Sequence, residues 1–384
     1  MTTMSERVSG PVTRQVPKRV AQSVFDGSSL RVVLLVDVHD EAQQEFLEAY
    51  EHLCSQVASV PGHVSDQICQ SIENPSQWLI TSEWESAPPF LAWVNSQEHM
   101  EMVRPLRNCV RDTRSLRFHI VRETGVPAPA ESGTRRLQSA ARIGDGKIRH
   151  ALTFTVKPGS EQTVAKILAD YAPPESRVDD TTRLCRTSLF MHGNRVVRAV
   201  EVEGDLPAAL RHVARQPQVR AVEEAINPYL EQERDLSDPE AARIFFFTAA
   251  VPAVHHVTAD DEFPGAARHA LYYPARPGRG MEVARLLAEQ DEAAANDPEC
   301  PVVRSTIFQR DDIVVRLVDV QSGLGGDPAH SLGRADSTQA AKLMSLLDGE
   351  ALGADGPALE SGDAARLFKL ARMELVTDRR SADV

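Results

Sequence analysis

The chain contains one pattern of apolar and polar positions twice. The segment RHALTFTVKPG at 149–159 returns as RHALYYPARPG at 268–278. In each copy a β-rich run ends at a Pro-Gly pair, which predicts a strand closed by a turn. Apolar residues at helical spacing follow both turns, so each copy predicts a strand and then a helix. These positions are Val164, Ile167, Leu168 and Tyr171 in the first copy, and Val283, Leu286 and Leu287 in the second.

The similarity continues through a predicted β-hairpin. RTSLFMHGNRVVRAVEV at 186–202 aligns with RSTIFQRDDIVVRLVDV at 304–320, and each has a polar turn between two β-rich runs. A second helix follows in both copies, and then a last strand. We place that strand in ARIFFFTAAV at 242–251 and in AARLFKLARMELV at 364–376. The resulting order, βαββαβ, predicts an α+β fold of the ferredoxin-like type.

The N-terminal third follows the same order of elements. Its expected elements are a strand at 30–38, a helix at 41–60, strands at 63–72 and 77–86, a helix at 88–108 and a strand at 115–123. We therefore expect three tandem ferredoxin-like units, at 30–124, 148–251 and 268–378. Residues rich in Pro, Gly and small side chains predict linkers at 125–147 and 252–267, and residues 1–29 predict a disordered tail.

A ferredoxin-like unit leaves one face of its sheet uncovered. Four antiparallel strands with both helices on one side need a second layer on the other, usually another sheet. We expect two units to pack as an intrachain pseudo-dimer of the dimeric α/β-barrel type. The third unit would pair within the chain or with a second molecule, which makes a homodimer one possible state.

Composition narrows the class of protein. The chain is 42% apolar and 25% charged, as soluble globular proteins are, and no apolar run approaches the ~20 residues of a membrane span. A net charge of −13 disfavours nucleic-acid partners. Five scattered cysteines without a CxxC pair fit a cytoplasmic protein without disulfides. We expect no metal site at His255-His256, because helical spacing and a third ligand are missing.

Three segments resemble known families. NPSQWLITSEWESAPPFLAWVNSQEHMEMVRPL at 74–106 resembles the antibiotic biosynthesis monooxygenase (ABM) family. RTSLFMHGNRVVRAVEVEGD and ARQPQVRAVEEAINPYLEQERDLSDPEAARIFFFTAAV resemble the tetracenomycin-type aromatic polyketide cyclases. The C-terminal unit, together with the middle one, is similar to the SchA/CurD family of spore-pigment-type polyketide clusters, through ALYYPARPG and VVRSTIFQRDDIVVRLVDV. All three resemblances point to bacterial aromatic polyketide biosynthesis.

The ABM resemblance implies oxygenation of a polycyclic phenol in an apolar cavity between sheet and helices. Such chemistry uses O2 as co-substrate and no flavin, metal or nicotinamide, because the ionised substrate reduces O2 itself. The protein excludes water and favours the phenolate with hydrogen-bond donors. An aromatic core is the alternative interpretation of the same residues. The substrate-binding candidates are Trp78, Ser82 and Trp84 on one strand face, Phe90 and Trp93 on the next helix, and Asn74 and His99.

The cyclase resemblance implies aldol chemistry, which needs a base and a donor for the enolate oxygen. Arg186, His192 and Arg198 lie on the hairpin that lines the pocket of those cyclases. His150 and His269 occupy the same position in the two repeated strands and are catalytic candidates as well. Each histidine could instead have a structural role, as the cap of a strand or a solvated turn residue.

Three functions remain open from the sequence. The first is an aromatic polyketide tailoring enzyme with a cofactor-independent oxygenase unit joined to cyclase-like units. The second is a cyclase/aromatase without oxygenation, in which the N-terminal unit is a lid and dimer mate. The third is a non-catalytic scaffold that binds the polyketide.

Overall fold

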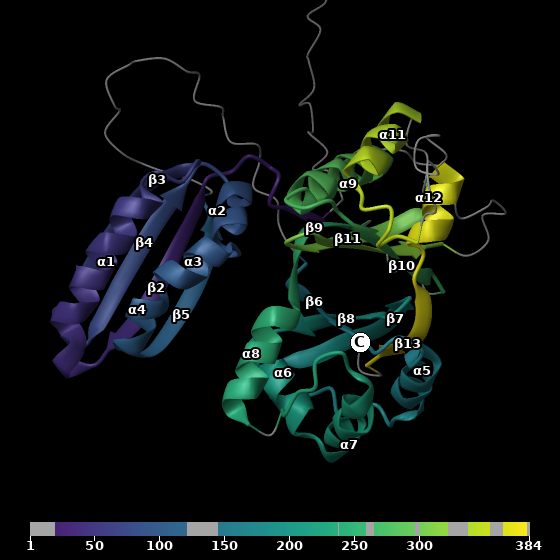
Figure 1. Cartoon of the computed structure of the whole chain (residues 1–384), viewed down its shortest axis with the longest axis horizontal. Helices are drawn as coiled ribbons and strands as arrows, with labels where there is room; N and C mark the ends of the chain where they lie inside the picture. Colours follow the sequence, from purple (N-terminus) through teal and green to yellow (C-terminus); the bar gives the residue numbers. More distant parts are fainter. Residues whose placement is uncertain are drawn as a thin grey trace, which may run out of the picture.

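The computed structural model describes residues 20–120, 145–236, 238–258, 265–295, 300–321, 337–353 and 364–381. The strands of these residues form one four-stranded and one nine-stranded sheet. Figure 1 shows the four-stranded sheet with its helices at one side of the molecule, and the larger sheet wrapped around the other side. The α+β class with tandem ferredoxin-like units is confirmed.

The N-terminal unit has the strand order β3-β4-β2-β5. Along β2, Leu30, Val32 and Val36 are buried beneath the helices while Arg31 and Leu35 are exposed, as expected for a sheet covered on one face. The second helix is broken into three segments; at the first break, the Ser96 side chain accepts a hydrogen bond from the His99 backbone N–H and starts a new helix. The elements are β2 (Leu30–Val38), α1 (Gln43–Val57), β3 (His63–Gln70), β4 (Gln77–Trp84), α2 (Ala87–Val94), α3 (Gln97–Met102), α4 (Arg104–Asn108) and β5 (Val110–His119).

The middle and C-terminal units share the larger sheet, in the order β10-β12-β11-β9-β6-β8-β7-β13. Its two ends meet, since the Met373 N–H donates to the Ala270 carbonyl over 2.9 Å and Leu271 bridges to Arg372. The sheet is therefore a closed barrel. Its strands are β6 (Lys147–Thr155), β7 (Arg183–His192), β8 (Arg195–Glu203), β9 (Ala250–Thr258), β10 (Ala267–Pro274), β11 (Val302–Arg310), β12 (Ile313–Val320) and β13 (Glu374–Arg380).

Helices cover the outside of this barrel. In the middle unit they are α5 (Glu161–Asp170), α6 (Leu206–Arg215), α7 (Pro217–Ile226) and α8 (Pro239–Ala249). In the C-terminal unit they are α9 (Gly280–Ala295), α11 (Ser337–Leu346) and α12 (Ala364–Ala371). No helix among the described residues is long and apolar enough to cross a membrane.

The middle and C-terminal units exchange their last strands. Strand β9 begins beside β6, where Val251 pairs with Ala151, and continues beside β11, where His256 pairs with Thr306. Strand β13 pairs with β7 of the middle unit along most of its length. The expected intrachain pseudo-dimer is thus built by strand exchange as well as by packing of faces.

Both predicted last strands were wrong in part. ARIFFF lies in α8, and the first residues of AARLFKLARMELV form α12; the strands begin only afterwards, at Ala250 and Glu374. A short apolar run cannot be assigned to helix or strand by periodicity alone. The missed signal is Asp238-Pro239, where the Asp238 carboxylate accepts a hydrogen bond from the Ala241 N–H at the start of the helix. Residues Pro252–Thr258, expected in a linker, therefore lie in β9.

The expected tail also contains a strand. β1 (Val20–Ser23) pairs with the half of β9 that extends beyond β6, so it covers backbone groups that would otherwise form a free edge. The sequence alone does not show this partner, because β9 was itself not recognised. Residues 1–19 of the expected tail and 125–144 of the first expected linker lie outside the described residues.

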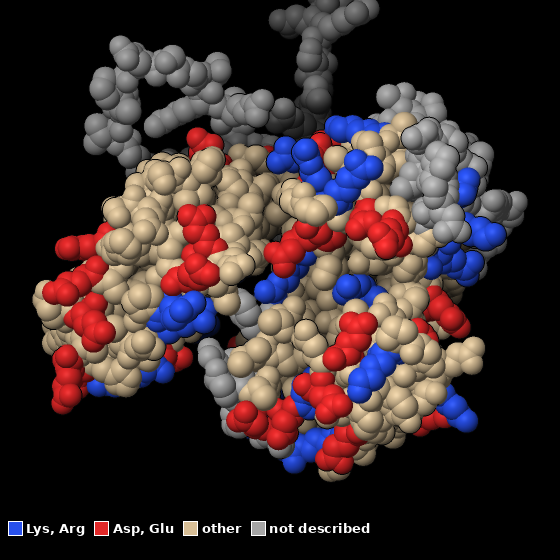
Figure 2. Space-filling model, viewed as in Figure 1, with Lys and Arg blue, Asp and Glu red and all other residues tan. Residues whose placement is uncertain are grey.

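Charges of both signs cover the surface. Figure 2 shows acidic and basic side chains interspersed over the described part of the face in view. This face therefore has mixed charge and not one continuous basic area.

Candidate functional site

A cavity of about 430 Å³ lies in the middle unit, between the outer face of β6–β8 and the helices α6, α7 and α8. Its walls are mostly apolar, as in sites that bind small organic molecules. Strands supply its floor, and helices together with the segment between α7 and α8 supply its walls. The main apolar lining residues are Leu152, Phe154, Tyr171, Val200, Val219 and Phe245.

Three charged side chains meet inside this cavity. Arg198 projects from β8, in register with Leu152 of β6. Glu223 of α7 lies 3.9 Å from an Arg198 nitrogen and 2.5 Å from a nitrogen of Arg234. The exposed fractions of the Arg198, Glu223 and Arg234 side chains are 14%, 16% and 8%, so the cluster is largely withdrawn from water.

Arg234 is fixed by its neighbours. Its guanidinium lies over the Phe245 ring at 3.8 Å and over the Phe154 ring at 4.6 Å from the centroids. Its backbone N–H donates to the Asn227 side chain over 2.8 Å. Burial lowers the pKa of Arg234, against the opposing effect of Glu223. The side chain therefore sits in a defined position with cation–π support.

Several donors in the cavity have no protein partner. The Nε atoms of Arg198 and Arg234 and the Oγ1 of Thr187 are buried without a hydrogen bond within the described residues. Buried polar groups are normally paired, so such donors indicate a place where a ligand oxygen can bind.

The C-terminal unit has the matching arginine in a closed environment. Arg316 of β12 occupies the position of Arg198 in the duplicated hairpin. Its Nη2 lies 2.5 Å from Asp291 Oδ1, and Ser305 Oγ donates to Asp291 Oδ2 over 2.6 Å. Around this pair the space under α9 and α11 is packed with buried apolar residues such as Leu287 and Met344.

Of the five catalytic candidates, Arg198 lies in the cavity. His150 lies opposite Val200 in the sheet, but it is not one of the lining residues. Burial, with the Arg310 charge, lowers the pKa of His150 to about 4. His269 has the same position in the C-terminal unit, and burial together with Arg372 lowers its pKa.

His192 lies inside the barrel and away from the cavity. It is in phase with Phe190 of the barrel core on β7. Its Nε2 is 2.7 Å from the Leu370 carbonyl oxygen, and its ring meets the edge of Tyr272 at 5.4 Å. These contacts give His192 a structural position at one end of the barrel.

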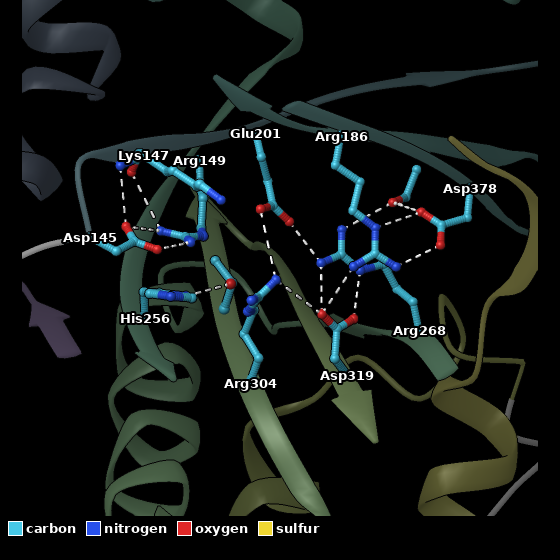
Figure 3. Close-up of polar contacts among 12 residues, drawn as sticks. Asp145, Lys147, Arg149, Arg186, Glu201, His256, Arg268, Arg304, Asp319 and Asp378 are labelled. Carbon is cyan, nitrogen blue, oxygen red and sulfur yellow. Dashed lines mark hydrogen bonds and ion pairs between the residues drawn. The ribbon is translucent and has the colours of Figure 1, made fainter. Parts of the chain in front are cut away.

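Arg186 also points into the barrel, where it belongs to a buried ion network (Figure 3). Arg186 contacts Asp378 and Asp319, and Arg268 joins Asp319 to Glu201. Burial alone would raise the pKa of Glu201, but Arg268, Arg149 and Arg304 lower it to about 2. The carboxylates and guanidinium groups of this network are therefore ionised, and their ion pairs connect the middle unit to the C-terminal unit.

In the N-terminal unit, the structure brings five of the seven substrate-binding candidates together. The Trp84 ring contacts Phe90 and Trp93, each at a centroid distance of 5.4 Å, and Trp93 contacts His99 at 4.2 Å. The Trp84 indole N–H donates to Ser82 Oγ over 3.0 Å. Burial, with the Arg107 charge, lowers the pKa of His99 to about 4.

The other two candidates lie apart from this aromatic cluster. Trp78 packs against Phe46, in a separate group of buried residues. Asn74 is exposed in the turn before β4, where its Oδ1 accepts hydrogen bonds from the backbone N–H and the hydroxyl of Ser76. Asn74 therefore shapes the hairpin turn.

Sequence reasoning missed most of the charged cluster in the middle unit. Glu223 and Arg234 both lie in the segment ARQPQVRAVEEAINPYLEQERD that resembles the cyclases, which was the available signal. Phe245 was missed because its segment was assigned to a strand. The structure places all three beside Arg198 in one cavity.

Comparisons with known proteins match the chain to two of the families that its sequence resembles. The family described as "SchA/CurD like domain" matches residues 147–259, and the family described as "Antibiotic biosynthesis monooxygenase" matches residues 29–105. The first match covers β6 to β9, so it falls on the middle unit and ends with the crossing strand.

Two bacterial relatives align with almost the whole chain. The chain is 63% identical to "Polyketide synthase CurD" of Streptomyces cyaneus, over 94% of this chain and 98% of that protein. It is 60% identical to the "42.8 kDa protein in whiE locus" of Streptomyces coelicolor, over 94% of this chain and 91% of that protein. Among solved structures, SnoaB, a cofactor-independent oxygenase from Streptomyces nogalater, is 16% identical over 27% of this chain and 99% of that chain, with a TM-score of 0.23.

Proposed function

Since this chain belongs to the SchA/CurD family, we propose that it is an aromatic polyketide tailoring enzyme whose reaction takes place in the cavity of the middle unit. The observation behind this proposal is the Arg198–Glu223–Arg234 cluster inside an apolar cavity of about 430 Å³. One relative that aligns with almost the whole chain is named a polyketide synthase, so the substrate class that we propose is an aromatic polyketide or its poly-β-ketone precursor.

The cluster supplies both parts of an aldol cyclisation. A methylene between two carbonyl groups is acidic, and the Glu223 carboxylate can accept its proton. Arg198 and Arg234 then stabilise the charge on the enolate oxygen. The enolate carbon bonds to a second carbonyl carbon, and protonated Glu223 returns the proton to the new alkoxide. The new C–C bond closes the ring, and the β-hydroxy ketone then loses its hydroxyl group and an α-proton as water, which forms a double bond; no oxidant or cofactor takes part.

The apolar walls of the cavity provide the other requirement of this reaction, a surface that binds the carbon skeleton and excludes water. Phe154, Phe245 and Tyr171 contribute apolar ring surface to the cavity wall, against which a folded polyketide or a new aromatic ring can pack. They also exclude water from the reacting carbons, which strengthens the electrostatic interactions at the cluster.

Substitution of Glu223 tests this function. The purified protein would be added to a reconstituted minimal polyketide synthase, and the cyclised and uncyclised products would be separated by chromatography and mass spectrometry. We expect Glu223→Gln to reduce the cyclised product about 100-fold, in line with loss of a general base. Glu224→Gln is the matched control, since Glu224 is on the same helix but exposed at the rim. A Glu223→Gln variant as active as wild type would contradict a catalytic cavity and favour a binding scaffold.

Oxygenation by the N-terminal unit is the second candidate function. It is supported by the ABM match at 29–105 and by the half-buried His99 beside Trp93; the lowered pKa of His99 keeps its imidazole neutral near pH 7. The substrate anion would reduce O2 directly, without flavin, metal or nicotinamide. O2 uptake with an anthrone, measured without added flavin or metal, tests this step, and absence of uptake would exclude it.

A further inference from the structure

The middle-unit cavity has a charge imbalance, from which we infer that it binds its substrate as an oxyanion: an aromatic phenolate, enolate or carboxylate. This inference rests on the proposed function, because it concerns the same cavity. It adds the ionic state of the ligand and the orientation of the ligand in the cavity.

The C-terminal unit shows how this fold neutralises an arginine at the same position. Arg316 pairs with Asp291 of α9, and the exposed fractions of the two side chains are 4% and 1%. Ser305, the counterpart of Thr187 on the preceding strand, donates its hydroxyl proton to the same carboxylate. One positive charge meets one negative charge, so the buried pair is complete.

The middle unit lacks that carboxylate. Aligning Val164 with Val283 and Leu168 with Leu287 gives Ala172 as the counterpart of Asp291 in sequence, and α5 already ends at Asp170, so no carboxylate is supplied from this position. Arg198 turns instead to Glu223, which is already bound more closely by Arg234. Two guanidinium groups therefore share one carboxylate in a largely buried site.

Charges at the rim do not correct this imbalance. Arg220, Glu224 and Asp235 also line the cavity, but all three are exposed. Water and salt screen such charges strongly, whereas a buried charge needs a partner close by. The missing partner of the inner cluster is thus one negative charge on the ligand.

The free donors indicate where that charge would lie. Arg198 Nε, Arg234 Nε and Thr187 Oγ1 are buried and unpaired in the described part of the chain, and the Arg234 side chain is only 8% exposed. Charge-assisted bonds from guanidinium groups to an oxyanion are among the strongest hydrogen bonds in proteins. The anionic end of the ligand therefore lies at these donors, and its rings lie along Phe154 and Phe245.

Calorimetric titration of the full chain with 2-naphthoate, 2-naphthol and 2-naphthamide tests the inference. We expect 2-naphthoate to bind at least tenfold more tightly than neutral 2-naphthamide at pH 7.5. Arg198→Gln should remove this preference, while Arg220→Gln at the rim should keep it. For 2-naphthol, we expect the bound form to ionise at lower pH than the free form, as followed by its absorbance.

The outcomes distinguish a carboxylate ligand from a phenolate or enolate ligand. They also distinguish a failure of the oxyanion inference from a failure of the proposed function. Preference for naphthoate without a shift in the ionisation of naphthol would identify a carboxylate ligand, and a shifted naphthol would identify a phenolate or enolate. Equal binding of naphthoate and naphthamide, or no binding of any probe, would overturn the oxyanion inference. The proposed function is tested independently by the product profile of Glu223→Gln.

Discussion

Arg186 of β7 and Asp378 of β13, 192 residues apart in the chain, form a two-point ion pair between the middle and C-terminal units. Nε lies 2.8 Å from Oδ1 and Nη2 lies 2.6 Å from Oδ2. The Arg186 side chain is only 5% exposed. The pair, drawn in Figure 3, therefore fixes the crossing strand β13 to the middle unit, which also contains the cavity.

Asp378→Ala should destabilise the barrel by about 3 kcal/mol, because it leaves the Arg186 guanidinium buried without its main partner. Chemical unfolding followed by far-UV circular dichroism measures the change. Asp180→Ala is the control, since its pair with Arg177 is exposed and should contribute less than about 1 kcal/mol. Equal effects of the two substitutions would show that the Arg186–Asp378 pair does not stabilise the barrel.

The same variant should separate two unfolding transitions. All three tryptophans, Trp78, Trp84 and Trp93, lie in the N-terminal unit, which has its own four-stranded sheet. Tryptophan fluorescence therefore reports unfolding of this unit, whereas circular dichroism reports the barrel as well. We expect Asp378→Ala to shift the dichroism midpoint to lower denaturant and to leave the fluorescence midpoint in place. A common shift of both midpoints would mean that the units unfold as one.

Local patterns predicted most elements of this fold. The repeated strands and hairpins could be identified because their alternation, Pro-Gly turns and helical spacing depend only on neighbouring residues. The crossing of β9 and β13 could not, because their pairing partners are distant in sequence. The buried pair His255-His256 shows the consequence: both residues seemed to belong to a linker, but they lie inside a strand that two units share.

The candidate site was predictable only in part. Arg198 was identified because two β-rich runs around a polar turn predict its hairpin, and the cyclase resemblance selects that hairpin as a pocket wall. Glu223 lies four residues after Val219 and so shares the apolar face of α7, whereas Glu224 does not; this helical spacing indicates which carboxylate faces inward but not that a cavity lies there. Arg234 comes from an irregular segment, and its position depends on Phe245, whose helix was mistaken for a strand.

His150→Gln should make stability less dependent on pH between pH 6.5 and 4. Burial lowers the pKa of His150 to about 4, so the unfolded chain binds a proton in this range before the folded chain does. Stability from neutral His150 is therefore complete above pH 6.5 and is lost as pH falls towards 4. We expect wild type to lose about 2 kcal/mol more than His150→Gln between pH 7 and 4.5.

Denaturant titrations at several pH values provide this measurement. His39→Gln is the control, because His39 is exposed before the first helix of the N-terminal unit. If His150→Gln and wild type lost stability equally on acidification, His150 would not be held neutral by the fold.

The two equivalent arginines should respond oppositely to the same substitution. Arg316→Met should cost about 3 to 5 kcal/mol, because it leaves Asp291 buried without its cation. Arg198→Met removes the guanidinium that lies farther from Glu223, while Arg234 remains bound to that carboxylate at 2.5 Å. We therefore expect Arg198→Met to leave stability unchanged or to raise it by up to about 1 kcal/mol, as removal of an unbalanced charge from a binding site often does. Denaturant unfolding midpoints of the two variants, measured in parallel, test this prediction. A large loss of stability in Arg198→Met would mean that this arginine is a structural residue like Arg316.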